Sequence, residues 1–224
     1  MANRVPIEID EWYHCYNRGV DKRRIFQTPR DYEKFLISVY LALGSKPLRR
    51  SNVKCNFLHE VLERVDIGGE RLVDIGAYVL MPNHFHMLLK EREEGSIALY
   101  MQRILTSYTM YFNKKNDRSG ALLAGTFKSK HVSDDDYLKH VVSYIHLNPV
   151  ELYAPEWKRG KGDTRAVEDY LNTYRYSSLH AFKDEKHPTR KILSDAIFDL
   201  YDTIPTPLEM LEDAKGYYET SPIE

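Results

Sequence analysis

Apolar and polar positions along the chain predict four β-strands. Residues 73–80 and 84–90 are β-rich runs separated by Pro82-Asn83, which predicts two adjacent strands joined by a turn. Residues 11–16 are rich in aromatic side chains and predict an earlier strand, while residues 125–132 alternate well enough to predict a later one.

Between and after these strands, apolar residues recur at the spacing of amphipathic helices. The pattern predicts one helix over residues 29–43, with Pro29 at its first position, and a second over residues 96–112. A third helix begins at the carboxylates Asp134 to Asp136, which favour the positive end of a helix dipole, and Pro149 stops it.

The resulting order is strand, helix, strand, strand, helix, strand, helix. This order predicts an α+β fold, a ferredoxin-like sandwich with a central antiparallel sheet and helices packed on it. One face of the sheet would be covered by helices, and the other would be open or covered by the last helix. We expect a core domain over residues 1–150 and a helical C-terminal extension over residues 151–224 that packs on it.

The extension is expected to contain helical or irregular packing segments at residues 169–182 and 193–201 and a short helix at 207–218. Residues 45–70 give a poor pattern, with one possible short helix at 57–65.

The composition of the 224 residues is that of an ordinary globular protein, and no apolar run approaches the roughly 20 residues that cross a bilayer. The N-terminus has no secretory hydrophobic region. Cys15 and Cys55 are the two cysteines, too few for a disulfide framework or a cysteine-rich zinc site. We therefore expect a protein of the reducing cytosol.

Charge is unevenly distributed. Residues 195–224 form an acidic tail with a net charge of −7, and since the whole chain carries −1, residues 1–194 carry +6. A mildly basic body permits phosphate binding without proving it. The 17 tyrosines could stack on bases, although most should be half-buried packing residues.

The chemistry of the chain centres on residues 84–90. His84 and His86 project from one face of the predicted strand, because side chains alternate along a strand. Two imidazoles on a rigid strand can be two ligands of a metal site, or two hydrogen-bonded structural histidines.

A second group lies on the predicted helix that starts at Asp134. His140, Tyr144 and Asn148 are spaced by four residues and share one helix face. With an amide or carboxylate oxygen and the two imidazoles holding a divalent cation, the tyrosine oxygen could attack a phosphodiester. His140 is better explained as a surface or packing residue, and His146 should point away from Tyr144. Pro149 disfavours helical geometry at Asn148.

Two blocks of sequence resemble a known family. Met81-Pro-Asn-His-Phe-His-Met-Leu-Leu89 and Tyr144-Ile-His-Leu-Asn-Pro-Val150 resemble the IS200-like tyrosine transposases, and in particular their REP-associated branch. Residues 17–26 also match the N-terminal block of that family, and the resemblance spans about residues 8–182.

The resemblance implies a metal-dependent single-stranded DNA endonuclease and strand transferase. Tyr144 would be the nucleophile, forming a 5′-phosphotyrosine link. His84, His86 and Asn148 would hold Mg²⁺ or Mn²⁺. The substrate would be single-stranded DNA next to a REP-like hairpin. We expect a bacterial cytosolic or nucleoid protein, with a monomer favoured and a dimer possible. Its backbone contacts would come from polar and basic residues of three segments, namely Asn17, Arg18, Lys22, Arg23, Arg24, Lys114, Lys115, Lys128 and Lys130.

Two other functions remain open at this point. A domesticated, catalytically silent protein would bind hairpin DNA without cleaving it. A metallohydrolase would use His84 and His86 with water as the nucleophile, without a covalent step.

Overall fold

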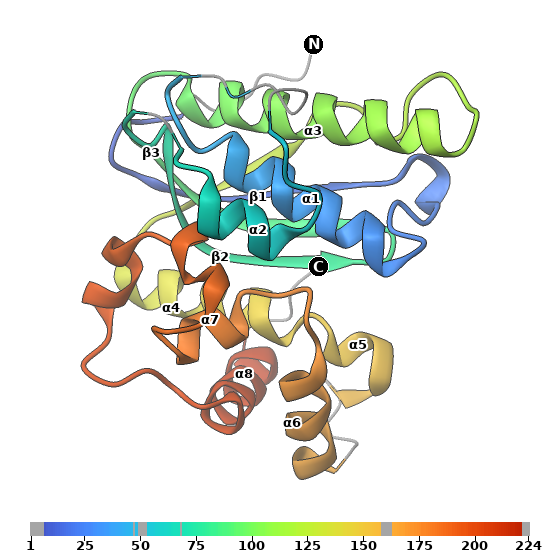
Figure 1. The fold of residues 1–224 in the computed structure, drawn as a ribbon. Helices are drawn as coiled ribbons and strands as arrows, with labels where there is room; N and C mark the ends of the chain where they lie inside the picture. Colours follow the sequence, from blue (N-terminus) through green and yellow to red (C-terminus); the bar gives the residue numbers. More distant parts are fainter. Residues whose placement is uncertain (1–6, 47, 49–52, 68, 158–162, 221–224) are drawn as a thin grey trace.

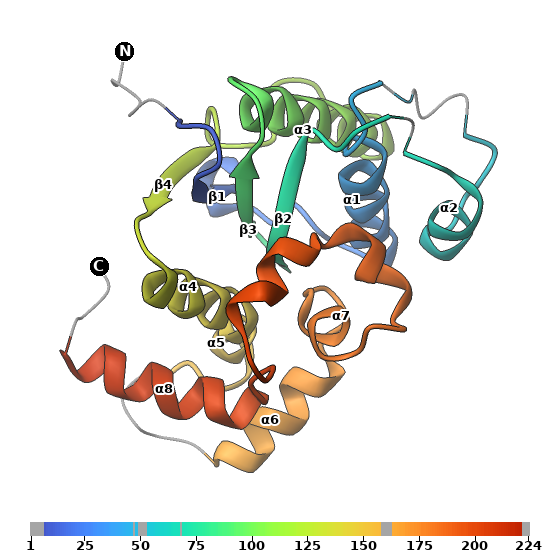
Figure 2. The same cartoon turned by 90° about the vertical axis from the view of Figure 1, so that its left-hand side faces the viewer.

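The computed structural model describes residues 7–46, 48, 53–67, 69–157 and 163–220, with side chains described to residue 214 (Figure 1). Its centre is one four-stranded sheet in the order β2-β3-β1-β4, in which every neighbouring pair is antiparallel. The strands are β1 (Trp12–Arg18), β2 (Val73–Met81), β3 (His84–Glu91) and β4 (Lys128–Val132). Helices α1 (Pro29–Leu41) and α3 (Ser96–Lys115) form the two crossovers. The predicted ferredoxin-like sandwich is confirmed (Figure 2).

Helices cover both faces of this sheet (Figures 1 and 2). On one face lie α1 and α3, where the rings of Phe35 and Phe85 pack with their centroids 5.1 Å apart. The opposite face is covered by α4 (Asp135–Leu147), whose buried apolar residues include Val142 and Ile145. Of the two arrangements expected for the second face, the structure has the one in which the last helix covers it.

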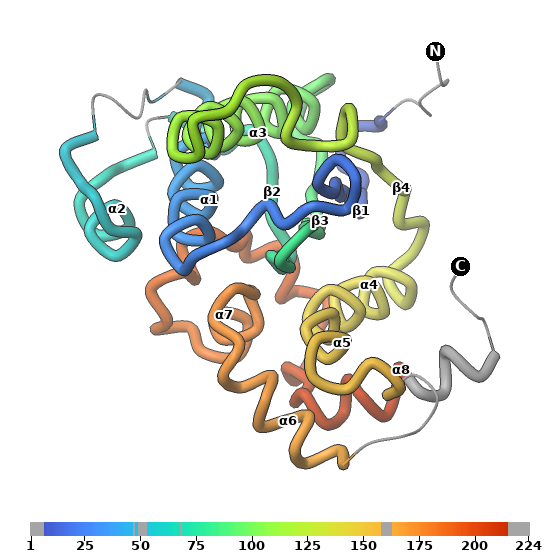
Figure 3. Tube along the Cα trace, turned by 90° about the vertical axis from the view of Figure 1, so that its right-hand side faces the viewer, coloured from blue at the N-terminus to red at the C-terminus, as the bar shows by residue number. Residues whose placement is uncertain are grey.

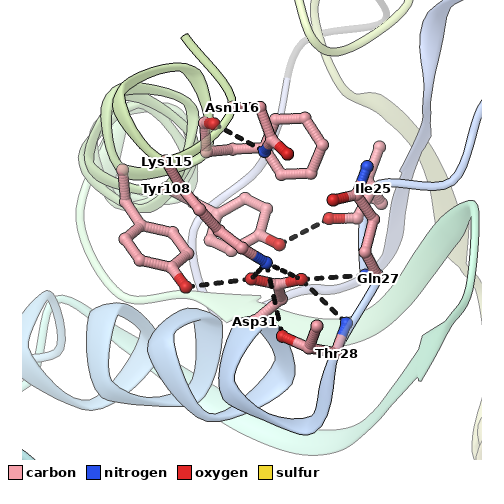
Figure 4. Close-up of polar contacts among 9 residues, drawn as sticks. Ile25, Gln27, Thr28, Asp31, Tyr108, Lys115 and Asn116 are labelled. Atoms are coloured by element: carbon pink, nitrogen blue, oxygen red, sulfur yellow. Dashed lines mark hydrogen bonds and ion pairs between the residues drawn. The ribbon is translucent and has the colours of Figure 1, made fainter.

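A buried carboxylate ties α1 to α3 (Figure 4). Asp31, in the first turn of α1, is fully buried and accepts hydrogen bonds from the backbone N–H groups of Gln27 and Thr28. From α3, Lys115 Nζ lies 2.7 and 2.8 Å from its two oxygens, and the Tyr111 hydroxyl donates at 2.9 Å. Asp31 therefore joins the N-terminal cap of α1 to the C-terminal half of α3.

The C-terminal extension packs under α4 and along β2 (Figure 3). Its helices are α5 (Val150–Tyr153), α6 (Thr164–Thr173), α7 (Leu179–Lys183) and α8 (Pro207–Thr220), with 3₁₀ turns η4 (Pro188–Ile192) and η5 (Asp195–Leu200). Between α6 and α7 a short turn pairs with β2 through a single bridge, where Leu80 N–H donates to Tyr176 O and Ser178 N–H donates to Tyr78 O. This segment covers the open edge of the sheet, because β2 is an outer strand.

The sequence predicted most of these elements, with one correction. The fourth strand begins at Lys128 instead of 125, because Gly125 has a positive φ of 79° and turns the chain. Residues 169–182 comprise the end of α6, a turn that covers the edge of the sheet, and most of α7, in keeping with the helical or irregular packing expected there. The possible helix at 57–65 is present as α2 (Leu58–Arg64), and a 3₁₀ turn η1 (Val20–Lys22) follows β1. Within residues 45–70, positions 47, 49–52 and 68 lie outside the described residues.

Candidate active site

The strand register gathers polar side chains on the face of the sheet under α4. Tyr16 lies opposite both His86 and Lys128, and Arg18 lies opposite His84. Side chains of directly opposed residues point to the same face of an antiparallel pair. The predicted pair of histidines therefore shares its face with basic side chains of β1 and β4.

Helix α4 brings Tyr144 to this face. The ring of Tyr144 makes edge-on contacts with His86 and His14, at centroid distances of 5.5 and 5.7 Å. Leu138, Val141, Val142 and Ile145 hold α4 on the sheet by burying its apolar side. Tyr144 is half-buried at the boundary of that side. A single chain therefore brings the predicted nucleophile to the predicted metal ligands.

Asn148 lies one helical turn after Tyr144 and reaches the other histidine. Its Oδ1 is 3.4 Å from His84 Nε2. The sequence-based objection that Pro149 disfavours helical geometry at Asn148 is wrong, because Asn148 has φ −50° and ψ −40° as the C-cap of α4. Pro149 is accommodated because it starts the next helical turn, with φ −60° at the N-cap of α5.

His84 and Asn148 each point a hydrogen-bond acceptor at the other, namely Nε2 of the imidazole and Oδ1 of the amide. Nδ1 of His84 lies 2.7 Å from Asn83 Oδ1, an oxygen that only accepts, so Nδ1 carries the ring proton. In the neutral ring Nε2 is then an acceptor, as is Asn148 Oδ1, and Asn148 Nδ2 is buried without a partner. Burial lowers the pKa of His84; the contact with Asn148 and the charge of Glu151 oppose this lowering, and the charge of Arg18 adds a smaller lowering. A cation between these two acceptors would satisfy both.

The residues present thus fit the implied metal. Two neutral imidazoles and an amide oxygen suit Mn²⁺, and the oxygen of a phosphate would complete a set that Mg²⁺ also accepts. Among the residues that the structure describes, no group of three or more histidine, cysteine, aspartate or glutamate side chains is placed to hold a metal ion. The predicted metal site consists of two histidines and an asparagine amide, so it does not count as a group of this kind.

Sequence reasoning missed His14. Its Nε2 lies 2.8 Å from Nδ1 of His86, and its half-buried ring also contacts Tyr144. Burial and, to a smaller extent, the charge of Lys130 lower the pKa of His14 to about 4, so the ring is neutral at physiological pH. The alternation of residues 11–16 places His14 and Tyr16 on one face, but only the register with β3 shows which face that is.

The remaining histidines of α4 lie elsewhere. His146 is fully buried on the side away from Tyr144, with Nε2 2.8 Å from Ser178 Oγ, as the spacing predicted. Its burial lowers its pKa to about 3. His140 is partly exposed, and its Nδ1 lies 2.7 Å from the carbonyl of Asp136 in its own helix.

The predicted DNA contacts divide into two groups. Asn17 and Lys115 have partners within the protein: Asn17 is buried and its Nδ2 donates to Gly125 O, while Lys115 is held by Asp31. We therefore leave these two residues out of the candidate DNA surface. The others are exposed basic side chains, namely Arg18, Lys22, Arg23, Arg24, Lys114, Lys128 and Lys130; of these, Arg23 pairs with the exposed Asp21 and Lys130 lies over the ring of Tyr137.

The loop that carries three of these basic residues is anchored beside His84. Gly19 N–H donates to Asn83 O, Ile25 N–H donates to Pro82 O, and Asn83 Nδ2 donates to Lys22 O. Residues 22–24 are thus held against the turn between β2 and β3, at the end of the sheet where His84 begins its strand.

The chain is similar to known proteins in sequence and in fold. Residues 49–148 match the family model of the IS200-like transposases, and this range contains His84, His86, Tyr144 and Asn148. The resemblance to the IS200-like transposase family is confirmed. A solved structure of a REP-associated tyrosine transposase bound to a REP hairpin is similar in fold, with a TM-score of 0.51 and 16% sequence identity, and the match covers 93% of this chain and 89% of that one. No curated protein matches the chain significantly.

The family model covers residues 49–148, and the similarity in fold extends over the C-terminal extension as well as the sheet. None of the helices in the described residues is both long and apolar enough to span a bilayer. The roles of the individual site residues, the metal and the boundary at residue 150 remain predictions.

Proposed function

We propose that this protein is a metal-dependent single-stranded DNA endonuclease and strand transferase that acts next to a DNA hairpin through a covalent 5′-phosphotyrosine. The observation that carries the proposal is the position of α4, which sets Tyr144 against His86 and Asn148 against His84 in one chain. The hairpin substrate is supported by the similar fold, which was solved bound to a REP hairpin.

In this mechanism the Tyr144 oxygen forms a bond to phosphorus, and the bond from phosphorus to the 3′ oxygen breaks. The strand leaves with a 3′-hydroxyl after taking up a proton, and the 5′ side stays on the protein. Since one phosphoester bond replaces another, the covalent link can later be passed to a second 3′-hydroxyl, which distinguishes strand transfer from hydrolysis.

The chain's own residues have separate parts in this step. His84, His86 and Asn148 would hold Mg²⁺ or Mn²⁺, which when bound polarises the phosphodiester and assists loss of the tyrosine proton. A tyrosine hydroxyl has a reference pKa of about 10, so such assistance is needed at neutral pH. Arg18 and Lys128 lie on the same sheet face and would hold flanking phosphates.

Other predictions remain open. The location in the bacterial cytosol or nucleoid and the preference for a monomer stay predictions. A monomer is supported by the pairing of Tyr144 with His86 of its own chain, since no exchanged helix is needed to bring them together.

The proposal is tested with a labelled single-stranded oligonucleotide that carries a hairpin, incubated with Mn²⁺ or Mg²⁺ and analysed on a denaturing protein gel. We expect a labelled protein band that disappears in Tyr144→Phe and with chelator. Tyr137→Phe is the matched control, because Tyr137 lies on the same helix but packs against Lys130, and it should keep the band.

The same experiment separates the alternatives. Binding of the hairpin with no cleavage under either cation would indicate the catalytically silent binding protein. Cleavage that persists in Tyr144→Phe without any adduct would indicate a metallohydrolase that uses water. An adduct that persists in Tyr144→Phe would exclude Tyr144 as the nucleophile.

A further inference from the structure

The C-terminal extension contains a cavity with a basic lining. The cavity, of about 520 Å³, is lined by Asn172, Thr173, Arg175, His180 and His187, from the end of α6, the start of α7 and the connections around them. Arg175 is exposed, and within the described part of the chain no carboxylate forms an ion pair with it. Its permanent charge thus has no protein counter-charge there.

The other lining groups supply hydrogen-bond donors. Lys183 Nζ donates to Asn172 Oδ1 at 3.1 Å, so the amide keeps its NH₂ group as a donor. His187 Nδ1 contacts Thr189, at 2.8 Å from its hydroxyl oxygen and 3.4 Å from its backbone nitrogen, so Nε2 is the ring nitrogen left for a ligand.

His180 adds an unpartnered nitrogen to the same cavity. Its ring stacks on that of His187 at a centroid distance of 5.9 Å, and its Nε2 is buried without a hydrogen bond. Burial lowers the pKa of His180, its neighbours His187, Lys183 and Arg175 lower it further, and a hydrogen bond to the backbone of Tyr174 opposes this lowering. The positive potential that these neighbours create disfavours protonation of the His180 ring, and the same potential would attract an anion.

One lining residue of the cavity, Arg175, lies beside the end of β2 that leads to the candidate active site. On either side of Arg175, the Tyr174 hydroxyl donates to Leu80 O at 2.6 Å and Tyr176 O accepts from Leu80 N–H. Arg175 is thereby fixed beside the last residues of β2, directly before the turn that leads to His84. The basic loop of residues 22–24 is bound to that same turn.

We propose that this cavity binds a backbone phosphate of the DNA strand that enters the candidate active site. The inference rests on the proposed function and gives the C-terminal extension a part in substrate binding. A guanidinium with amide and imidazole donors matches the anionic oxygens of a phosphodiester. A nucleic acid is favoured over free phosphate, because the cavity and the basic loop together offer cations for several phosphates at one end of the sheet.

The test measures binding and not chemistry. Anisotropy of a labelled single-stranded hairpin oligonucleotide is recorded between about 50 and 200 mM salt, with chelator present and Tyr144→Phe as the background. Adding Arg175→Ala should weaken binding about tenfold and reduce the slope of log K against log salt by about 0.7, the value for one lost phosphate contact on a single strand. Arg165→Ala removes the same charge near the start of α6, and it should leave the affinity and the slope close to those of the background.

Arg175→Lys keeps the charge but not the planar guanidinium, so it should restore the slope and only part of the affinity. Equal slopes and affinities for Arg175→Ala and the background would overturn the proposal.

If inorganic phosphate shifts the ring signals of His180 and His187 in NMR while Arg175→Ala leaves oligonucleotide binding unchanged, the cavity binds free phosphate and the DNA assignment is wrong. A wild-type protein that forms no adduct would refute the proposed catalysis, while the slope still decides the role of the cavity.

Discussion

Nε2 of His14 lies 2.8 Å from Nδ1 of His86, and their rings stack with centroids 5.0 Å apart. The contact joins neighbouring strands β1 and β3 and engages Nδ1 of His86, so a metal held by His86 would be bound through Nε2. Groups that hold the second nitrogen of a metal-binding histidine fix its tautomer and ring orientation. His14 is therefore a positioning residue for His86.

Replacing His14 by alanine should weaken Mn²⁺ binding by about 10- to 100-fold, the usual effect of losing such a partner. Isothermal titration calorimetry with Mn²⁺ measures the change. His131→Ala is the control, because His131 lies on the adjacent strand β4 but pairs with Glu11. Equal Mn²⁺ affinities of His14→Ala and wild type would show that His14 does not position the ligand.

Asn148→Asp should lower the stability of the metal-free protein and raise its affinity for the metal. The substitution removes an amide nitrogen that is buried without a partner and puts a carboxylate 3.4 Å from His84 Nε2. Without metal the buried charge should lower the free energy of unfolding by about 1–3 kcal/mol. With metal the carboxylate is a stronger ligand for a hard cation, so saturating Mn²⁺ should recover the loss.

Urea unfolding with and without Mn²⁺ checks this prediction. A variant that is equally destabilised in both conditions would place Asn148 outside the metal site. Asn148→Leu, which removes the oxygen, should instead lose the stabilisation that Mn²⁺ gives to wild type.

The sequence alone predicted the strands of the sheet and four residues of the candidate site. Alternation placed His84 and His86 on one face, and a spacing of four placed Tyr144 and Asn148 on one side of a helix, because both are properties of a single element. The position of His14 depends on which residue of β1 lies opposite His86, and local periodicity does not determine pairing between distant strands.

Lys115 illustrates a second limit. In the sequence it is one of several lysines near the end of a helix, and the expectation of DNA contact followed from its charge alone. Its partner Asp31 is 84 residues away and fully buried. Only tertiary structure shows that Lys115 is paired with a buried carboxylate.

Gly19→Ala should impair DNA binding through the basic loop. A Cβ at residue 19 would lie 2.3 Å from the carbonyl oxygen of Arg23 and 2.9 Å from the side chain of Ile25, so the loop must move away from the turn that holds it. We expect a loss of about 1–3 kcal/mol in stability, as for overpacking, together with weaker oligonucleotide binding.

Thermal unfolding and anisotropy measure the two effects of Gly19→Ala. Gly95→Ala is the control, since its Cβ would meet no atom within 4 Å and its cost comes from the positive φ of 80°. Gly95→Ala should lose stability while keeping its DNA affinity. Full DNA affinity in Gly19→Ala would show that the position of the basic loop does not matter for binding.

Asp31 should make the stability of the protein depend on pH. Burial alone would raise the pKa of its carboxyl, but hydrogen bonds from Lys115, Gln27, Tyr111 and Thr28 outweigh burial and hold the pKa below its usual 3.8. A carboxyl with a lowered pKa in the folded state stabilises the fold above its unfolded pKa, and the contribution is lost as the pH falls through the folded value. Wild type should therefore lose stability below about pH 4.

Asp31→Asn should lower the free energy of unfolding by about 1–3 kcal/mol at pH 7, because the amide cannot accept all the hydrogen bonds that the buried carboxylate accepts. Urea unfolding between pH 7 and pH 3 should show the gap to wild type closing as the pH falls, since the variant has no carboxyl to protonate at this position. Lys115→Met should be destabilised in a similar way, and the double variant by less than the sum of the two, because the residues act as a pair. Additive losses, or a gap that stays constant with pH, would show that the carboxylate of Asp31 does not link α1 to α3 electrostatically.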